Sequence, residues 1–178
     1  MRLLFLFLIF SQVVNAQKYF TRTGLTEFKA SIDAFEPVEA KNNSCSVILN
    51  TNTGDIAALI PINAFKFKIA LMQEHFNENY MDSDKFPKAT FKGKVENFNK
   101  NNLDTKKKHQ IKGILTIRNI SKNIDISATF HRIDTKTIIK SNFKVKPEDF
   151  GIEIPSVVRK KIAKTINISL NYELTEKK

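Results

Sequence analysis

A period-two alternation of apolar and polar side chains recurs in short runs along most of this chain, and it restricts the fold more than any other feature. In the first run, Phe28, Ala30 and Ile32 alternate with charged or polar neighbours, as in a strand with one buried face. Similar runs, separated by turn chemistry, follow at residues 45–50, 56–62, 89–98, 110–118, 124–130, 136–146 and 166–172. About eight short strands, joined mostly by hairpins, predict an all-β antiparallel fold, either a sandwich or a barrel.

One stretch of the chain, residues 65–80, follows a helical period instead. Its apolar side chains recur at spacings of three and four, and Met72 and Phe76 belong to the apolar face. Pro87 prevents the helix from continuing into the next strand. A second helical turn is allowed over residues 155–163, because proline is compatible with the first turn of a helix. The predicted fold therefore includes one short inserted helix and allows a further helical turn near the C-terminus.

Small residues with inward parity raise the question whether such a barrel is filled or hollow. A closed sheet of about eight strands has no exposed edge and can hold either packed side chains or one small ligand. Ala30, Ala58, Gly113 and Ala128 are small and lie among larger inward neighbours. They either leave space or fit the taper of a packed barrel, and the sequence does not decide between these two interpretations.

The first 16 residues have the pattern of a secretory signal peptide. A basic start at Arg2 precedes an apolar run at residues 3–10, and Ala16 offers a small residue before a cleavage point. This apolar run is too short to cross a bilayer, which takes about 20 residues. We therefore expect an exported domain over residues 17–178, periplasmic or secreted, without a transmembrane helix.

Cys45 is the only cysteine of the chain, so no internal disulfide can form. It lies in a predicted strand, away from the end of the signal peptide where a lipoprotein anchor would stand. A strand cysteine of this kind is expected to be inert.

No catalytic or metal-binding constellation stands out in the sequence. His75 lacks the second histidine of a zinc-protease helix, and a single cysteine makes a closed zinc site improbable. Turn and cap chemistry explains the carboxylates of Asp82 and Asp84, while Glu148 and Asp149 come with no nucleophile or base that can be named. The sequence therefore favours a binding protein that is not an enzyme and uses no metal or cofactor.

The chain is basic, with a formal net charge of +11 and a pI near 9.7. Such a charge can attract an acidic partner, or it can belong to an ordinary solvated surface, and both interpretations stay open. The lysines are spread along the chain, with their densest run at residues 106–108. Because export leaves no obvious nucleic acid to bind, a nucleic-acid partner is not expected.

Three motifs occur in order along the predicted domain. Residues 83–91 read S-D-K-F-P-K-A-T-F, residues 113–122 read G-I-L-T-I-R-N-I-S-K, and residues 149–152 read D-F-G-I. Together these motifs resemble the YceI-like family of exported lipid-binding proteins. The chain departs from the family pattern at Asn119, where Gly is common, and it lacks the Trp often seen near the D-F-G motif.

The resemblance implies an antiparallel, lipocalin-like barrel with a helix over one side and an elongated apolar pocket. It further implies that the pocket holds a polyisoprenoid or another long-chain amphiphile, in a family without an established catalytic activity. The physical chemistry agrees, because each buried CH₂ group of a ligand contributes about 0.8 kcal/mol and no reactive residue is needed.

Strand parity and the helical face supply the candidate residues of this pocket. Met72 and Phe76 on the helix are expected to cover it. The side chains expected to form the tunnel wall are Phe28, Ile32, Phe91, Leu115, Ile117, Ile126, Phe130, Phe143 and Ile168. The alternative hypothesis is a basic secreted module that docks on acidic surfaces without a lipid ligand. The sequence leaves open the identity of the ligand and whether the chain forms a homodimer.

Overall fold

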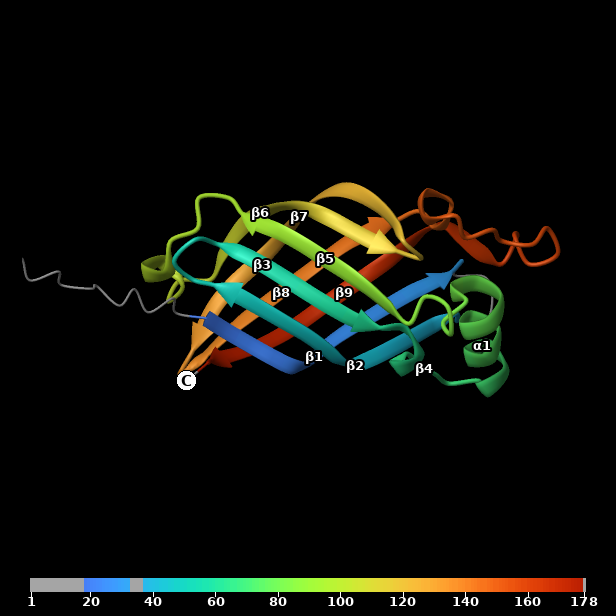
Figure 1. Ribbon diagram of the computed structural model, residues 1–178, viewed down its shortest axis with the longest axis horizontal. Helices are drawn as coiled ribbons and strands as arrows, with labels where there is room; N and C mark the ends of the chain where they lie inside the picture. The colour runs from blue at the N-terminus through green and yellow to red at the C-terminus, as the bar shows by residue number, and fades with distance from the viewer. Residues whose placement is uncertain (1–17, 33–36, 178) are drawn as a thin grey trace, which may run out of the picture.

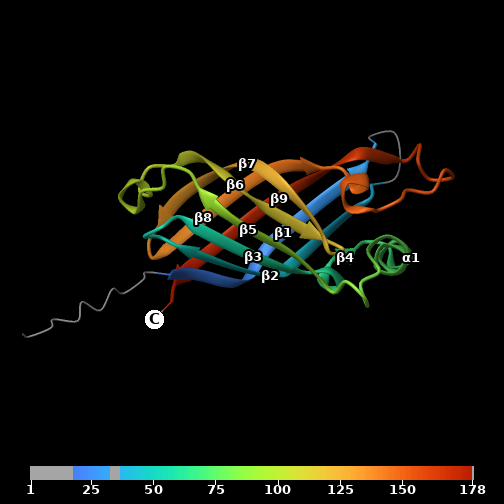
Figure 2. The ribbon, with the colours of Figure 1, turned by 45° about the horizontal axis from the view of Figure 1, so that its top comes forward.

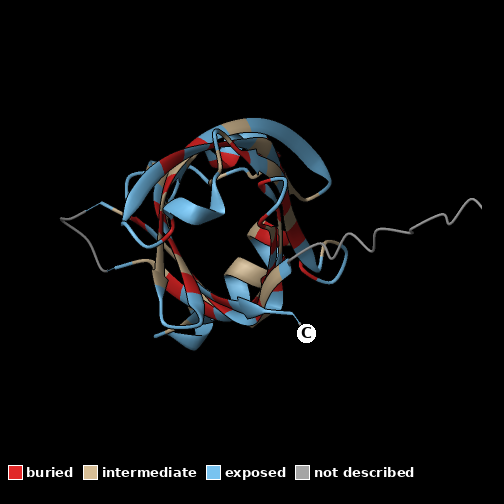
Figure 3. Ribbon diagram, turned by 90° about the vertical axis from the view of Figure 1, so that its left-hand side faces the viewer, coloured by how far each residue is buried: buried red, intermediate tan, exposed pale blue. Residues whose placement is uncertain are grey.

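Eight antiparallel strands of the computed structural model close into a barrel, which confirms the predicted all-β architecture (Figure 1). The structure describes residues 18–32 and 37–177. The strands of the barrel are β1 (Lys18–Ser31), β2 (Glu39–Asn50), β3 (Asp55–Pro61), β5 (Lys88–Val95), β6 (Lys107–Ile117), β7 (Ile120–Ile133), β8 (Lys136–Val145) and β9 (Ile162–Glu176). They are paired in the order β1-β9-β8-β7-β6-β5-β3-β2, and pairing of β1 with β2 closes the ring that Figure 3 shows end-on.

A short helix interrupts the strands between β3 and β5. The elements of this connection are η1 (Ile62–Ala64), β4 (Lys66–Phe67), α1 (Ala70–His75) and its π-helical continuation η2 (Phe76–Met81). The sequence placed the start of the helix at residue 65, and this is wrong, because β4 is extended and pairs with β2 outside the ring. Strand β3 pairs with β2 only at residues 46–49, which leaves the edge at residues 40–41 free to accept β4.

The second helical turn lies at a different place from the predicted one. A 3₁₀ turn, η4 (Pro147–Phe150), ends at Gly151, whose φ of +63° lies in the left-handed region that favours glycine. Residues 155–161 form successive hydrogen-bonded turns instead of the predicted helix. Strand β9 already begins at Ile162, where it pairs with β1, so no room remains for a helix extending to residue 163.

The two ends of the barrel differ (Figures 1 and 2). One end, here called the closed end, contains the turns at residues 51–54 and 134–135 and the connection of residues 96–106 with η3 (Lys100–Asn102). Both ends of the described chain lie there too. At the other, the helix end, lie α1 with η2, the turn between β6 and β7, and the connection from β8 to β9.

Side chains fill the closed end of the barrel. The ring of Phe130 has no exposed surface and packs against the rings of Phe98 and His109, at centroid separations of 5.8 and 5.5 Å. The other large, fully buried side chains at this end are Leu49, Val95, Leu103 and Leu174. None of these buried side chains lines the apolar cavity of the barrel, and this packed group is here called the plug.

Gly113 does not leave open space in the barrel, contrary to one interpretation of its inward parity. It lies opposite Gly93, and the ring of Phe91 covers both glycines. A Cβ atom built at either glycine would stand 2.6 Å from Cζ of Phe91. The two glycines therefore allow an aromatic ring to lie flat on the barrel wall.

Replacing Gly113 by Ala is expected to destabilise the fold by about 3 kcal/mol through overpacking. The added Cβ would lie 2.5 Å from the carbonyl oxygen of Lys92 and 2.7 Å from Cα of Gly93, and neither backbone atom can move aside freely. Urea unfolding measures the loss. The control is Ile114→Ala on the neighbouring outward position, where the side chain is 48% exposed and the loss should stay near about 1 kcal/mol or less. Equal losses in the two variants would contradict the expected crowding.

Candidate functional site

An apolar cavity of about 600 Å³ occupies the barrel from its middle to the helix end. All eight strands of the ring contribute to its wall, and nearly all the lining side chains are aliphatic or aromatic. The outermost lining residues, among them Leu71, His75 and Lys161, are exposed at the helix end, so the mouth of the cavity lies there. The volume falls in the range of about 300–1,000 Å³ that is usual for small-molecule sites.

Most of the side chains predicted from strand parity and from the helical face line this cavity. They are Phe28, Phe91, Leu115, Ile117, Ile126, Phe143 and Ile168 on the strands, and Met72 and Phe76 on the helix. Ala30, Ala58 and Ala128 line it as well, so these small residues leave space in the interior. That these residues contact a ligand stays a prediction.

Two of the predicted wall residues lie elsewhere. Phe130 has the inward parity but stands in the plug at the closed end, because parity fixes the side of a strand and not the height along the barrel. Ile32 follows the last residue of β1 and is 42% exposed, since strand alternation no longer applies beyond the strand. Neither residue belongs to the cavity wall.

Other lining residues were missed by the sequence reasoning. Val47, Ile56 and Ile60 share the inward parity of their strands, and the same parity argument could have found them. The residues contributed by the connection from β8 to β9, such as Val158 and Lys161, carry no periodic signal. Only the folded chain brings this connection to the mouth.

An aromatic cluster joins the helix to the barrel at the mouth. Phe76 of η2 stacks on Phe28 of β1 at 5.4 Å between centroids and also contacts Phe65 and Phe67, at 5.6 and 5.1 Å. Such aromatic pairs are favourable in offset or edge-to-face geometry. Because α1 itself has no buried residue, these contacts of Phe76 hold the helix beside the mouth.

The polar groups near the floor of the cavity are hydrogen-bonded to one another. The hydroxyls of Thr26 and Tyr172 lie 2.8 Å apart, and the thiol of Cys45 donates to Oγ1 of Thr26 at 3.1 Å. Burial raises the pKa of Tyr172 and that of Cys45, an effect that the hydrogen bond with Thr26 opposes only in part. Both groups therefore stay protonated and uncharged at neutral pH, and the floor offers no anionic nucleophile.

The Cys45 thiol is expected to resist thiol reagents in the folded protein at pH 8. Its side chain is fully buried, and its pKa lies above the ordinary thiol value of about 8.5, so little thiolate forms and little reagent reaches it. A colorimetric disulfide reagent should react with one thiol per chain in urea and with almost none before unfolding. Fast stoichiometric reaction of the native protein would show that the floor is open to solvent.

Histidine, cysteine and carboxylate groups form no metal-binding cluster in the part of the chain that the structure describes. Nowhere in residues 18–32 and 37–177 do three or more His, Cys, Asp or Glu side chains gather so as to hold a metal ion. His109, which follows the lysine run, is buried in the plug between aromatic rings. Within the same ranges, no helix has the length and apolar character that crossing a membrane requires.

The fold is a closed antiparallel β-barrel with one plugged end, an apolar cavity of the volume usual for small-molecule sites, and a helix beside the mouth. The YceI-like domain model matches residues 11–174, and the chain belongs to the YceI-like family. This match confirms the resemblance that the three sequence motifs suggested. No curated protein matches the sequence of this chain.

Several solved structures share the fold at low sequence identity. A polyisoprenoid-binding domain from Saccharophagus degradans implicated in plant cell wall breakdown has a TM-score of 0.77 and 14% identity, covering 90% of this chain and 98% of that one. BcnA of Burkholderia cenocepacia has a TM-score of 0.70 and 14% identity, over 85% and 96%. A YceI protein of Campylobacter jejuni has a TM-score of 0.60 and 19% identity, over 94% and 88%.

Proposed function

We propose that this protein is an exported, non-catalytic binding protein that holds a polyisoprenoid or another long-chain amphiphile in the barrel. The observation that carries the proposal is the cavity of about 600 Å³, lined almost wholly by apolar side chains, with exposed lining residues at the helix end. The name of the similar Saccharophagus degradans domain, a polyisoprenoid-binding domain, supports this choice of ligand.

The geometry favours an orientation with the tail inside and the headgroup at the mouth. Burial of about ten CH₂ groups contributes about 8 kcal/mol, against which stands the entropic cost of association. The floor has only uncharged hydroxyl and thiol groups that are already hydrogen-bonded, so burying a charged headgroup there would be unfavourable. Lys161 at the mouth is the one charged residue among the described residues that line the cavity.

The N-terminal pattern supports export to the periplasm or beyond. The proposed signal peptide, residues 1–16, lies outside the described residues, so its support is the sequence alone. Fractionation of cells that express the full chain, with the mass of the mature protein, tests this part. A product found only in the cytoplasm and still carrying residues 1–16 would contradict export.

Native mass spectrometry of the protein purified from an exporting host tests ligand binding. The expected result is one amphiphile per chain, or uptake of added polyprenol or quinone. In a series of alkyl chains, affinity should rise with each CH₂ until the cavity is full and then level off. An empty protein that takes up none of these ligands would overturn the proposal. The alternative, a basic docking module without a lipid ligand, does not account for the apolar cavity.

A further inference from the structure

The connection from η4 to β9 contains a run of basic residues beside the mouth of the cavity. Residues 155–164, here called the basic loop, comprise the end of this connection and the first three residues of β9. They include Arg159, Lys160, Lys161 and Lys164 and no acidic residue. All four basic side chains are exposed. The loop extends beyond the ends of the strands, at the same end of the barrel as α1 (Figures 1 and 2).

Exposed apolar side chains accompany these charges at the helix end. Val157 of the basic loop is 86% exposed, the highest value among the large exposed apolar side chains of the described chain. Leu71 and Ile69, at the start of the helix, are 57% and 36% exposed, and Ile32 at the end of β1 is 42% exposed. Apolar side chains next to lysine and arginine are the combination that binds the interface of an anionic bilayer.

The same segments form the mouth of the cavity. Val158 and Lys161 of the basic loop and Ile69 and Leu71 near α1 line the cavity, while Val157 beside them points to solvent. A surface that holds the basic loop would therefore also face the mouth. We propose that the helix end of this protein docks on an anionic lipid bilayer, with the basic loop making the first contact.

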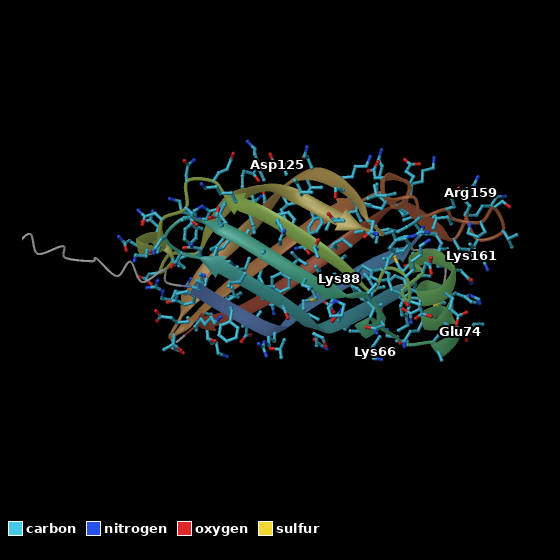
Figure 4. All side chains as sticks on the ribbon, viewed as in Figure 1. Lys66, Glu74, Lys88, Asp125, Arg159 and Lys161 are labelled. Carbon is cyan, nitrogen blue, oxygen red and sulfur yellow. The ribbon has the colours of Figure 1, made fainter. Side chains whose placement is uncertain are left out.

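The charges around the mouth determine which side of the helix end would contact an anionic bilayer first. Figure 4 shows Arg159 and Lys161 above Glu74 of α1 at the helix end, with Lys66 on the lower side. Glu74 and Glu78 are exposed, and α1 and η2 contain no lysine or arginine, so these elements would be repelled by anionic headgroups. The exposed Lys66 beside them offsets this in part, whereas the basic loop has four basic residues and no acidic one and would be attracted. Docking is thus tilted toward the basic loop. If the proposed lipid function holds, this orientation lets a tail pass between bilayer and cavity without crossing water.

Because the chain contains no tryptophan, a single introduced tryptophan can report vesicle binding by its fluorescence. Val157→Trp introduces a single indole in the basic loop, and its emission is recorded with vesicles of phosphatidylcholine, with and without phosphatidylglycerol. The expected result is a blue shift and protection from an aqueous quencher, with binding about tenfold stronger to the anionic vesicles. The matched control is Ile133→Trp on the β7–β8 hairpin of the closed end, where the native side chain is 50% exposed and no shift is expected.

Two charge-reversal variants test whether vesicle binding depends on the position of the basic residues or only on the net charge of the protein. In the Val157→Trp background, Lys160→Glu with Lys164→Glu should weaken vesicle binding by about tenfold or more. Lys106→Glu with Lys107→Glu changes the net charge by the same amount, but at the closed end of the barrel. This second pair should weaken vesicle binding far less. Neither pair lines the cavity, so ligand uptake should be unchanged in both.

Several results would overturn the docking proposal. They are equal effects of the two charge reversals, an emission shift only for Ile133→Trp, equal binding to vesicles without anionic lipid, or a shift caused by self-association without vesicles. Failure of ligand uptake with intact vesicle binding would instead overturn the proposed function, so the two failures are distinguishable.

Discussion

Replacing Ala58 by Phe is expected to weaken the binding of a long-chain amphiphile by about a hundredfold. Ala58 lies in the middle of β3, lines the cavity, and is paired with Phe91 on β5 and Val47 on β2, which line it too. A phenyl ring at this position would project into the space that a ligand tail needs. Displacing about four CH₂ groups would cost about 3 kcal/mol of binding free energy, which is about a hundredfold in Kd.

The neighbouring residue provides a matched control for this variant. Ala57 on the same strand does not line the cavity, so Ala57→Phe adds the same ring to the outside of the barrel. Titration with a fluorescent fatty acid or polyprenol analogue should show near-normal affinity for Ala57→Phe and a large loss for Ala58→Phe. Thermal melting of both variants checks that they fold. Normal binding by a folded Ala58→Phe protein would mean that the ligand does not use this cavity.

Replacing Phe130 by Ala is expected to destabilise the protein by about 3–5 kcal/mol, the usual loss when a fully buried aromatic residue is truncated. Its side chain has no exposed surface and contacts the rings of Phe98 and His109, so truncation opens a hole in a packed region. The urea midpoint and slope give the loss. The effect on ligand affinity should be small, because Phe130 belongs to the plug and not to the cavity wall.

The comparison variant is Phe143→Ala on β8, which removes the same ring from the cavity wall. Part of the Phe143 side chain already borders empty space, so its truncation forfeits fewer contacts and should cost less than about 2 kcal/mol. Ligand affinity should fall for Phe143→Ala more than for Phe130→Ala. The reverse order, with a stable Phe130→Ala protein that binds poorly, would place Phe130 in the ligand site and contradict the plug.

The contrast between Phe130 and Phe143 shows what the alternation along a strand predicts and what it does not. Phe130 and Phe143 both have inward parity, and the sequence assigned both to the tunnel wall. Parity depends only on the local period of a strand, so it predicts the inner face well. The height of a residue in the barrel depends on the register with neighbouring strands. In this fold, that register places Phe130 opposite Lys107 at the closed end.

The basic loop shows a second property that local sequence patterns do not predict, namely which segments meet at the mouth. Its residues lack a helical or strand period, and the sequence suggested a short helix there. The loop reaches the mouth only because β8 ends and β9 begins on the same side of the barrel as α1. Lys161 is thereby brought to the rim of a cavity whose other walls come from strands far away in sequence. No local pattern contains this information.

The sequence alone determined the strand class of the fold, the inserted helix, the inward face of each strand and the family, because these depend on local periods and short motifs. The tertiary structure decided that the interior is hollow toward one end and filled at the other. It also decided which connections surround the mouth. The physical reason is that empty volume and rim composition arise from the register and closure of eight strands together, whereas the alternation within each strand is compatible with either a filled or a hollow barrel.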